Sequence, residues 1–254
     1  MNPREYLVVE AFAEVASYRI PEYHNFHKTL PLPPPTAIVG MAGAALGLSP
    51  SDAQVFFDES DVEIGIQGTY QGIYSDLWKI ESTKRGTESS VLKREYLFNN
   101  KYMFVFGAGE AVINALNEAF GRNYYALTAG NSDSLMKICA CAIYPQLAIK
   151  DIGSVEHCVL HGDLRSSMRI GLDDLIPNNI YRYSTIISPV TYNVPYAFDY
   201  PDDEPRSIRF RQELTFVGTR AELTGGMTVP AIIHNDVSIP VFTYSKYAIS
   251  GKTG

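Results

Sequence analysis

The sequence predicts an α+β fold, with a ferredoxin-like (RRM-like) domain over residues 1–140 that carries an inserted β-hairpin and is followed by a β-rich extension over residues 141–254. The first half reads as strand, helix, strand, hairpin, strand, helix, strand, which is the element order of the split βαβ arrangement. The second half contains strand-like pieces between turns rich in Pro and Asp, as in an extension or a degenerate second domain. With 46% hydrophobic and 19% charged residues, the chain can bury a sizeable core, which excludes a disordered or fibrous class.

The first strand and the helix after it are predicted from two patterns. Residues 5–17 alternate, with Leu7 and Val9 on one face and glutamates on the other, as in a long half-buried strand. The loop of residues 17–36 contains three consecutive prolines, which cannot donate backbone hydrogen bonds, so we expect it to be extended. Thr36 is a suitable N-cap for a helix over residues 37–48, whose small side chains permit close packing against a neighbour.

The other elements of the first half follow from periodicity and turn residues. Alternation predicts strands over residues 62–67 and 101–107. Between them, residues 77–98 are predicted to form a protruding hairpin. Apolar side chains at helical spacing predict a helix over residues 109–121, and a fourth strand is expected over residues 123–130.

The turn that follows this fourth strand is a candidate binding site. It consists of Gly130, Asn131 and Ser132, a composition typical of helix N-termini and tight turns. Backbone N–H groups in such a turn can hold a phosphate. The alternative is that the segment is only a turn.

Charge is distributed unevenly along the chain. The 21 Lys and Arg against 28 Asp and Glu give a net charge of −7, which argues against general adhesion to nucleic acids or membranes. Residues 77–101 reverse this balance with six basic and three acidic side chains, and residues 206–254 do the same. Within the second segment, Arg206, Arg209 and Arg211 are either a phosphate ladder or an exposed edge kept soluble by charge. Two basic segments indicate a local polyanion site, while ordinary surface ion pairs would give the same counts.

Cysteine usage indicates reduced thiols and no metal. Cys139, Cys141 and Cys158 are an odd number without the spacing of a disulfide framework. Together with His161 they lack the paired C-x-x-C spacing of a zinc site, which favours buried thiols instead. Since no Rossmann or Walker pattern is present, we expect no cofactor.

We expect a cytoplasmic protein without membrane contact. The first fifteen residues carry three glutamates where a signal peptide would be basic and then apolar. The longest apolar run, residues 38–48, is far shorter than the roughly 20 residues that span a bilayer.

Aromatic and basic side chains gather in the loop before the prolines, namely Arg19, Tyr23, His24, His27 and Lys28. Three interpretations stay open. The aromatic rings pack beneath the sheet, or they stack on unpaired RNA bases while Arg and Lys contact phosphates. In the third, a histidine takes the proton of a 2′-hydroxyl and the loop is a metal-independent ribonuclease site.

Three stretches resemble the Cas-five family, the RAMP-type subunit of type I CRISPR Cascade complexes. Residues 27–48, HKTLPLPPPTAIVGMAGAALGL, are similar to the family's Pro-Pro-Thr loop and small-residue helix. The matching positions are Pro34, Pro35, Thr36, Ile38, Val39, Gly40, Met41, Gly43, Ala44 and Gly47. Residues 92–106 resemble the R-E-Y-L stretch, and residues 124–138 resemble the L-G-x-S segment. The resemblance covers residues 5–140.

This resemblance implies an RNA-binding structural subunit with a projecting thumb, which corresponds to the hairpin of residues 77–98. Such a subunit grips the 5′ handle of the CRISPR RNA (crRNA), caps the backbone of Cas-seven subunits, docks a Cas-eight-type large subunit and meets target DNA through the complex. The implied thumb contacts to RNA or partners are Lys79, Lys84, Arg85, Lys93 and Arg94. The loop containing Arg19, Tyr23, His24, Lys28 and Thr36, and the turn of Gly130, Asn131 and Ser132, would lie near the handle.

One branch of the family cuts precursor RNA with Tyr, Lys and His, and Tyr23, His24 and Lys28 are the positions that could serve those roles. The sequence looks closer to the non-processing I-B or I-A kind, so we expect no catalytic residues. The alternatives are a metal-independent endoribonuclease that processes repeat RNA, and a protein-interaction module without an RNA role.

Overall fold

The computed structural model describes residues 4–24, 26–80, 90–170, 189–202 and 204–245. The first elements are β1 (Arg4–Ala16), β2 (Tyr18–Arg19), β3 (Phe26–His27), β4 (Thr29–Leu30), α1 (Pro35–Leu46), α2 (Pro50–Glu59), β5 (Glu63–Thr69), β6 (Gly72–Ile80), β7 (Ser90–Gly109) and α3 (Glu110–Gly121). They are followed by β8 (Lys137–Pro145), β9 (Ile149–Ile152), β10 (Ser154–Val155), β11 (Cys158–His161), β12 (Met168–Arg169), β13 (Val190–Asp199), β14 (Ser207–Val217), β15 (Ala221–Leu223), β16 (Val229–His234) and β17 (Val237–Thr243). The described residues are therefore mostly β, with three α-helices. Within them, no helix is long and apolar enough to cross a membrane.

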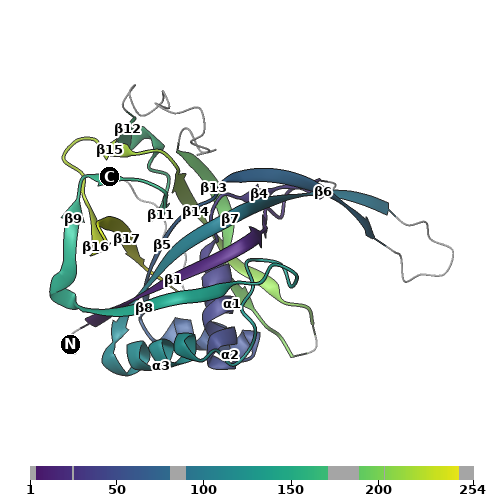
Figure 1. Ribbon diagram of the computed structural model, residues 1–254, viewed down its shortest axis with the longest axis horizontal. Coiled ribbons are helices and arrows are strands. Elements are labelled where there is room, and N and C mark those ends of the chain that lie inside the picture. The colour runs from purple at the N-terminus through teal and green to yellow at the C-terminus, as the bar shows by residue number, and fades with distance from the viewer. Residues whose placement is uncertain (1–3, 25, 81–89, 171–188, 203, 246–254) are drawn as a thin grey trace.

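Four antiparallel strands in the order β8, β1, β7, β5 form the centre of the molecule. The three helices gather on one side of this sheet (Figure 1). Leu7 and Val9 of β1 belong to the same buried cluster as Phe104 and Phe106 of β7, and residues of all three helices contribute to that cluster. The predicted alternation of β1 is thus confirmed on this face.

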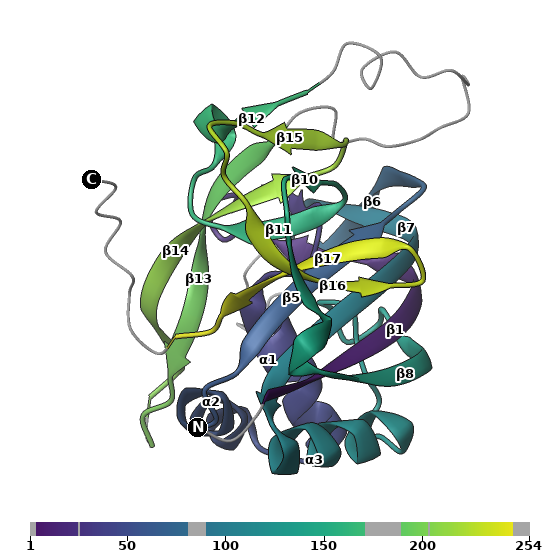
Figure 2. The ribbon, with the colours of Figure 1, turned by 90° about the vertical axis from the view of Figure 1, so that its left-hand side faces the viewer.

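The opposite face of β1 is more buried than the sequence predicts. Tyr6 and Val8 are 3% and 0% exposed, because they pack against β16 and β17 from the far end of the chain (Figure 2). The prediction of a half-buried strand is therefore wrong over the first part of β1. Burial of one such side chain contributes about 1.5–3 kcal/mol, so β16 and β17 help to hold the sheet.

Helix α1 begins at the prolines and ends at a glycine. Its N-cap is Pro34, so the prediction of Thr36 as N-cap is wrong, and Thr36 lies in the first turn instead. The fixed φ of proline suits the first helical position and needs no N–H partner there. Gly47, with φ +76°, closes the helix by donating its N–H to the Ala44 carbonyl, and the Leu48 N–H bonds to the Gly43 carbonyl.

Helix α2 is absent from the sequence prediction. The Ser49 side chain accepts a hydrogen bond from the Asp52 N–H at 3.1 Å, and Pro50 follows as the first helical residue. A serine N-cap followed by proline is a helix-start pattern that the sequence does contain. α2 packs closely on α1, because a Cβ atom added to Gly43 would lie 2.4 Å from that of Ala53.

The predicted hairpin is present as β6 and β7, which project from the body of the molecule (Figure 1). Its second strand is continuous with the strand predicted over residues 101–107, because β7 runs without a break from Ser90 to Gly109. The hairpin is therefore an outward extension of the central sheet rather than a separate insertion. Lys84 and Arg85 lie outside the described residues.

The predicted fourth strand is wrong in position. Residues 123–130 form turns with a single bridge, Thr128 to Leu135, and the strand beside β1 is β8. The reason is that the Tyr124 and Tyr125 N–H groups bond to the Ala45 and Ala44 carbonyls, which leads the chain across the end of α1.

The chain after α3 is β-rich, as predicted. β14 pairs with β13 and β11, and β5 continues the same sheet into β17, β16 and β9. A smaller sheet contains β10, β15 and β12. Residue 140, the predicted domain boundary, falls within β8, and this boundary stays a prediction.

Candidate functional site

A groove of about 610 Å³ lies where α1, the loop after β1, the turn after α3 and the β13–β14 ribbon meet. Segments far apart in the sequence contribute to it. The residues that line it are Ser17, Tyr18, Arg19, Pro21, Leu30, Pro34, Thr36, Ala37, Gly40, Met41, Ala44, Thr128, Gly130, Asn131, Pro195, Phe198, Arg206 and Ile208. The groove thus joins four residues predicted as site residues, namely Arg19, Thr36, Gly130 and Asn131.

The groove is positively charged although the protein is acidic. Among the described residues that line it, the two charged ones are Arg19 and Arg206, and none is Asp or Glu. Within the described part of the chain, neither arginine forms an ion pair. The Arg206 guanidinium lies over the Phe198 ring, 4.6 Å from its centroid. Two arginines without carboxylate partners suit a bound anion, because guanidinium groups bind phosphate with paired hydrogen bonds.

The start of α1 adds a partial positive charge to the groove. Thr36, in the first turn, lines the groove, and Pro34 provides no side-chain cap. Pro35 has no N–H and the Ala37 and Ile38 N–H groups bond to the Pro34 carbonyl, so the contribution of the helix is its dipole, which is positive at this end. An anion in the groove would therefore be stabilised by the helix as well as by the arginines.

The turn of Gly130 and Asn131 forms another part of the groove wall. Gly130 has φ +92°, and a Cβ atom at this position would lie 2.1 Å from the Ser17 carbonyl oxygen. Asn131 Nδ2 is buried and has no hydrogen-bond partner among the described residues. The turn therefore offers an amide donor to a ligand. Ser132 is exposed but does not line the groove.

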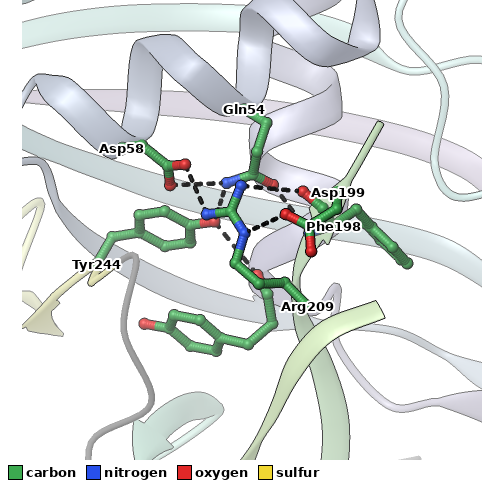
Figure 3. Close-up of polar contacts among 7 residues, drawn as sticks. Gln54, Asp58, Phe198, Asp199, Arg209 and Tyr244 are labelled. Atoms are coloured by element: carbon green, nitrogen blue, oxygen red, sulfur yellow. Dashed lines mark hydrogen bonds and ion pairs between the residues drawn. The ribbon is translucent and has the colours of Figure 1, made fainter. Parts of the chain in front are cut away.

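The β13–β14 ribbon is fastened to α2 by a polar network (Figure 3). Arg209 donates to Asp58 at 2.7 Å and to Asp199 at 2.6 Å. Gln54 donates to the Tyr244 hydroxyl at 2.8 Å and accepts from the Phe198 N–H at 3.2 Å. The network holds Phe198 in place, and with it the ring on which Arg206 lies.

Of the three arginines that the sequence suggested as a phosphate ladder, two are paired with carboxylates. Arg209 contacts Asp58 and Asp199, and Arg211 contacts Glu22. Only Arg206 of the three reaches the groove. The sequence interpretation could not separate them, since pairing depends on residues 10 to 189 positions away.

The hairpin carries a second group of cations and aromatic rings. Lys93 lies over the Phe26 ring at 5.2 Å, and Arg94 lies over the Trp78 ring at 4.3 Å. On the same face of the hairpin as Trp78, the rings of Tyr74 and Tyr96 stack on each other with centroids 5.4 Å apart. Stacked rings beside cations suit unpaired bases and their phosphates. Lys79, also on the hairpin, is exposed.

The loop residues suggested for catalysis lie outside the groove. Tyr23 and His24 are exposed, and Lys28 lies over the Tyr23 ring, 5.0 Å from its centroid. None of the three is among the residues that line the groove. The sequence interpretation therefore placed them in the right loop, but other residues of that loop line the groove, namely Ser17, Tyr18, Arg19, Pro21, Leu30, Pro34 and Thr36.

His27, in the same loop, is buried rather than exposed. Its side chain is 7% exposed, and Nδ1 lies 3.2 Å from Arg94 Nη2. Burial lowers the pKa of His27 from 6.5, and the positive charges of Arg19 and Arg94 lower it further. His27 is thus neutral at neutral pH and can accept a hydrogen bond from Arg94.

We predict that His27 makes the fold sensitive to acid. Because its pKa is lower in the folded state, the unfolded state binds more protons below about pH 6.5, and stability is lost as pH falls through that value. His27→Asn is expected to remove up to about 1.4 kcal/mol per pH unit of this dependence. Urea unfolding between pH 5 and 8 measures it, with the exposed His24→Asn as control. An equally steep pH dependence in both variants would contradict the prediction.

The cysteines and His161 are not brought together. Cys139 and Cys141 lie on β8 and Cys158 on β11, and β1, β7 and β5 lie between these two strands in the sheet. At about 4.8 Å between neighbouring strands, that separation is far beyond the span of one metal ion. In the described ranges, no group of three or more His, Cys, Asp or Glu could hold a metal.

Solved structures are similar to the chain at low sequence identity. A CRISPR protein from Archaeoglobus fulgidus has a TM-score of 0.51 at 8% identity, over 94% of this chain and 99% of that one. A chain of a CRISPR RNA-guided surveillance complex has a TM-score of 0.45 at 12% identity, over 92% and 91%. A further Cas protein has a TM-score of 0.35 at 18% identity over 50% of this chain, which spans 57% of that protein's length. The first of these likenesses shows a shared fold.

Sequence comparison identifies the family. No curated protein matches the chain. The family model described as CRISPR-associated protein (Cas_Cas5) matches residues 6–141, which is more than half of the 254 residues. This range contains α1, α3, the hairpin and most of the groove-lining residues. The chain belongs to the CRISPR-associated protein (Cas_Cas5) family.

Proposed function

We propose that the protein is an RNA-binding structural subunit of a type I CRISPR Cascade complex, of the non-processing I-B or I-A kind. It holds the 5′ handle of the crRNA, caps the Cas-seven backbone and docks a Cas-eight-type large subunit. The observation that carries the proposal is a groove whose described lining includes Arg19 and Arg206 and no carboxylate, in a protein of net charge −7. Family membership supports the choice of RNA as the anion.

The strand order supports a ferredoxin-like RAMP domain as the carrier of the groove. In chain order, the central strands and helices run β1, α1, β5, β7, α3, β8. In the sheet, the strands run β8, β1, β7, β5, so the first and third strands are central. This arrangement places the loop after β1 and the turn after α3 at the same end of the sheet, where both line the groove.

The proposed grip combines phosphate contacts and stacking. Arg19, Arg206 and the first turn of α1 contact phosphates, which fixes the position of the strand without reading its sequence. The Phe198 ring and the buried Asn131 amide in the same groove offer a stacking surface and a donor to a base. Trp78 and Arg94 of the hairpin form a second basic, aromatic surface outside the groove.

The other face of the hairpin fits a protein partner. Leu77 and Val91 are 69% and 68% exposed, and they lie on neighbouring positions of the two strands beside Lys79 and Lys93. Exposed apolar side chains grouped on a projecting element are typical of an interaction surface. We therefore assign this face to a neighbouring subunit and the Trp78 face to RNA.

We further propose that the subunit binds RNA without cutting it. Tyr23, His24 and Lys28 lie outside the groove, so an RNA strand in the groove would not be placed for attack by them. Repeat RNA incubated with the protein in EDTA is expected to stay intact. Cleavage that His24→Ala abolishes would instead support a metal-independent endoribonuclease.

The proposal is tested by purifying the tagged protein from its native host. We expect it to carry short RNAs with one common repeat-derived 5′ end, together with other Cas proteins. Sequencing of the RNA 5′ ends and mass spectrometry of the proteins measure this. If the protein is recovered with Cas proteins but without RNA, the proposed binding of the 5′ handle is wrong. If it is recovered without any partner, only the family assignment stands.

A further inference from the structure

Two adjacent tyrosines beside the groove are highly exposed. Tyr124 is 72% and Tyr125 is 53% exposed, and their rings form an edge-to-face pair with centroids 4.7 Å apart. Most aromatic side chains of the described residues are instead buried or half-buried. Two neighbouring rings in solvent forgo a substantial hydrophobic stabilisation, so their exposure calls for an explanation.

The backbone that carries these rings is held firmly. The Tyr124 and Tyr125 N–H groups bond to the Ala45 and Ala44 carbonyls at 2.9 and 3.1 Å, and the Asn123 side chain donates to the Tyr125 carbonyl at 2.6 Å. The Tyr124 ring also lies against Gly47, where an added Cβ atom would meet it at 2.8 Å. These contacts explain the backbone path but leave the outward faces of the rings unused.

The tyrosine pair adjoins the groove in two ways. Ala44, whose carbonyl binds the Tyr125 N–H, is itself a groove-lining residue. Thr128, another lining residue, follows Tyr125 by three positions, so their Cα atoms are at most about 10 Å apart. A strand that leaves the groove past Ala44 therefore meets the tyrosines next.

We propose that Tyr124 and Tyr125 form a stacking platform for an unpaired base of the RNA strand that leaves the groove. The inference rests on the proposed function, and it extends the RNA path beyond the groove. A base is favoured over a protein side chain because the platform is continuous with the positively charged groove. Tyrosine rings stack on any base, so the platform adds affinity without selecting a sequence.

The test compares RNA with a backbone that has no bases. The probes are a 12-nucleotide oligoadenylate and a 12-unit abasic ribose-phosphate strand, which carry the same charge. The combined change Tyr124→Ser and Tyr125→Ser is expected to weaken oligoadenylate binding about tenfold and to leave abasic binding and the salt dependence unchanged. Stacking of one base accounts for an effect of this size. The variant Tyr124→Phe with Tyr125→Phe keeps both rings and should bind as the wild type does.

Each alternative result has a separate meaning. Oligoadenylate binding that is unaffected by the serine changes, yet lost on Arg19→Ala with Arg206→Ala, would overturn the platform and keep the proposed function. If the serine variant loses affinity for both probes to the same extent, the platform is also overturned, since such a loss would show that the groove itself is damaged. If the wild type binds neither probe, the proposed function fails together with this inference. Unchanged RNA binding with lost assembly of the complex would assign the tyrosines to a protein partner.

Discussion

Replacing Arg19 and Arg206 together with alanine is expected to weaken binding of single-stranded RNA about 100-fold at physiological salt. Each guanidinium lines the groove and has no ion-pair partner among the described residues, so each is available to a phosphate. A hydrogen bond to a charged group contributes about 1.5–3 kcal/mol, which is at least tenfold in affinity per arginine. Fluorescence anisotropy with the 12-nucleotide oligoadenylate, on the purified full-length protein, measures the change.

The dependence on salt separates a phosphate contact from a structural effect. For single-stranded nucleic acid, the slope of log K against log salt falls by about 0.7 for each phosphate contact, so the double variant should lose about 1.4. The matched control is Arg220→Ala, since Arg220 is 59% exposed and pairs with Glu222 on β15, away from the groove. An unchanged slope in the double variant, or an equal loss in the control, would contradict the assignment of the groove to RNA.

Much of the groove could be predicted from local sequence patterns. The prolines before α1, the glycine that ends it and the Gly130 turn are all signals within a few residues, and the structure places each of them in or beside the groove. The basic and aromatic character of the loop containing Arg19 was likewise visible. These features depend on backbone propensities that act over short distances, which is why the sequence alone discloses them.

The opposite wall of the groove could not be predicted, because it depends on contacts between distant residues. Phe198 and Arg206 reach the groove only because Arg209 and Gln54 fasten the β13–β14 ribbon to α2. The only local sign of α2 that we find in the sequence is the N-cap residue Ser49 followed by Pro50. In the same way, β8 replaces the predicted fourth strand because Tyr124 and Tyr125 bond to α1 rather than to a strand. Pairing across 79 to 151 residues leaves no local pattern.

Gly130→Ala is expected to lower the free energy of unfolding by about 3 kcal/mol and to weaken RNA binding about tenfold. Gly130 has φ +92°, a conformation that costs a residue with a Cβ atom about 1–2 kcal/mol. The added Cβ would lie 2.1 Å from the Ser17 carbonyl oxygen, which belongs to the backbone and cannot rotate away. The Ser17 N–H bonds to the Ala129 carbonyl at 3.1 Å, so relief of the clash must separate the loop after β1 from the turn after α3. Urea unfolding and anisotropy, at a temperature where the variant is folded, measure both effects.

Gly162→Ala is the matched control, because it separates the backbone conformation from the clash. Gly162 has φ +85°, nearly the same as Gly130, but a Cβ atom added there would meet no atom of the other described residues, beyond its two chain neighbours, within 4 Å. The control should therefore lose only the 1–2 kcal/mol of the left-handed conformation, with RNA binding unchanged. The difference between the two variants then isolates the contact between Gly130 and Ser17, which joins two walls of the groove. Equal losses of unfolding free energy and of RNA affinity in both variants would mean that the Gly130 turn can shift without cost and that the groove does not depend on this contact.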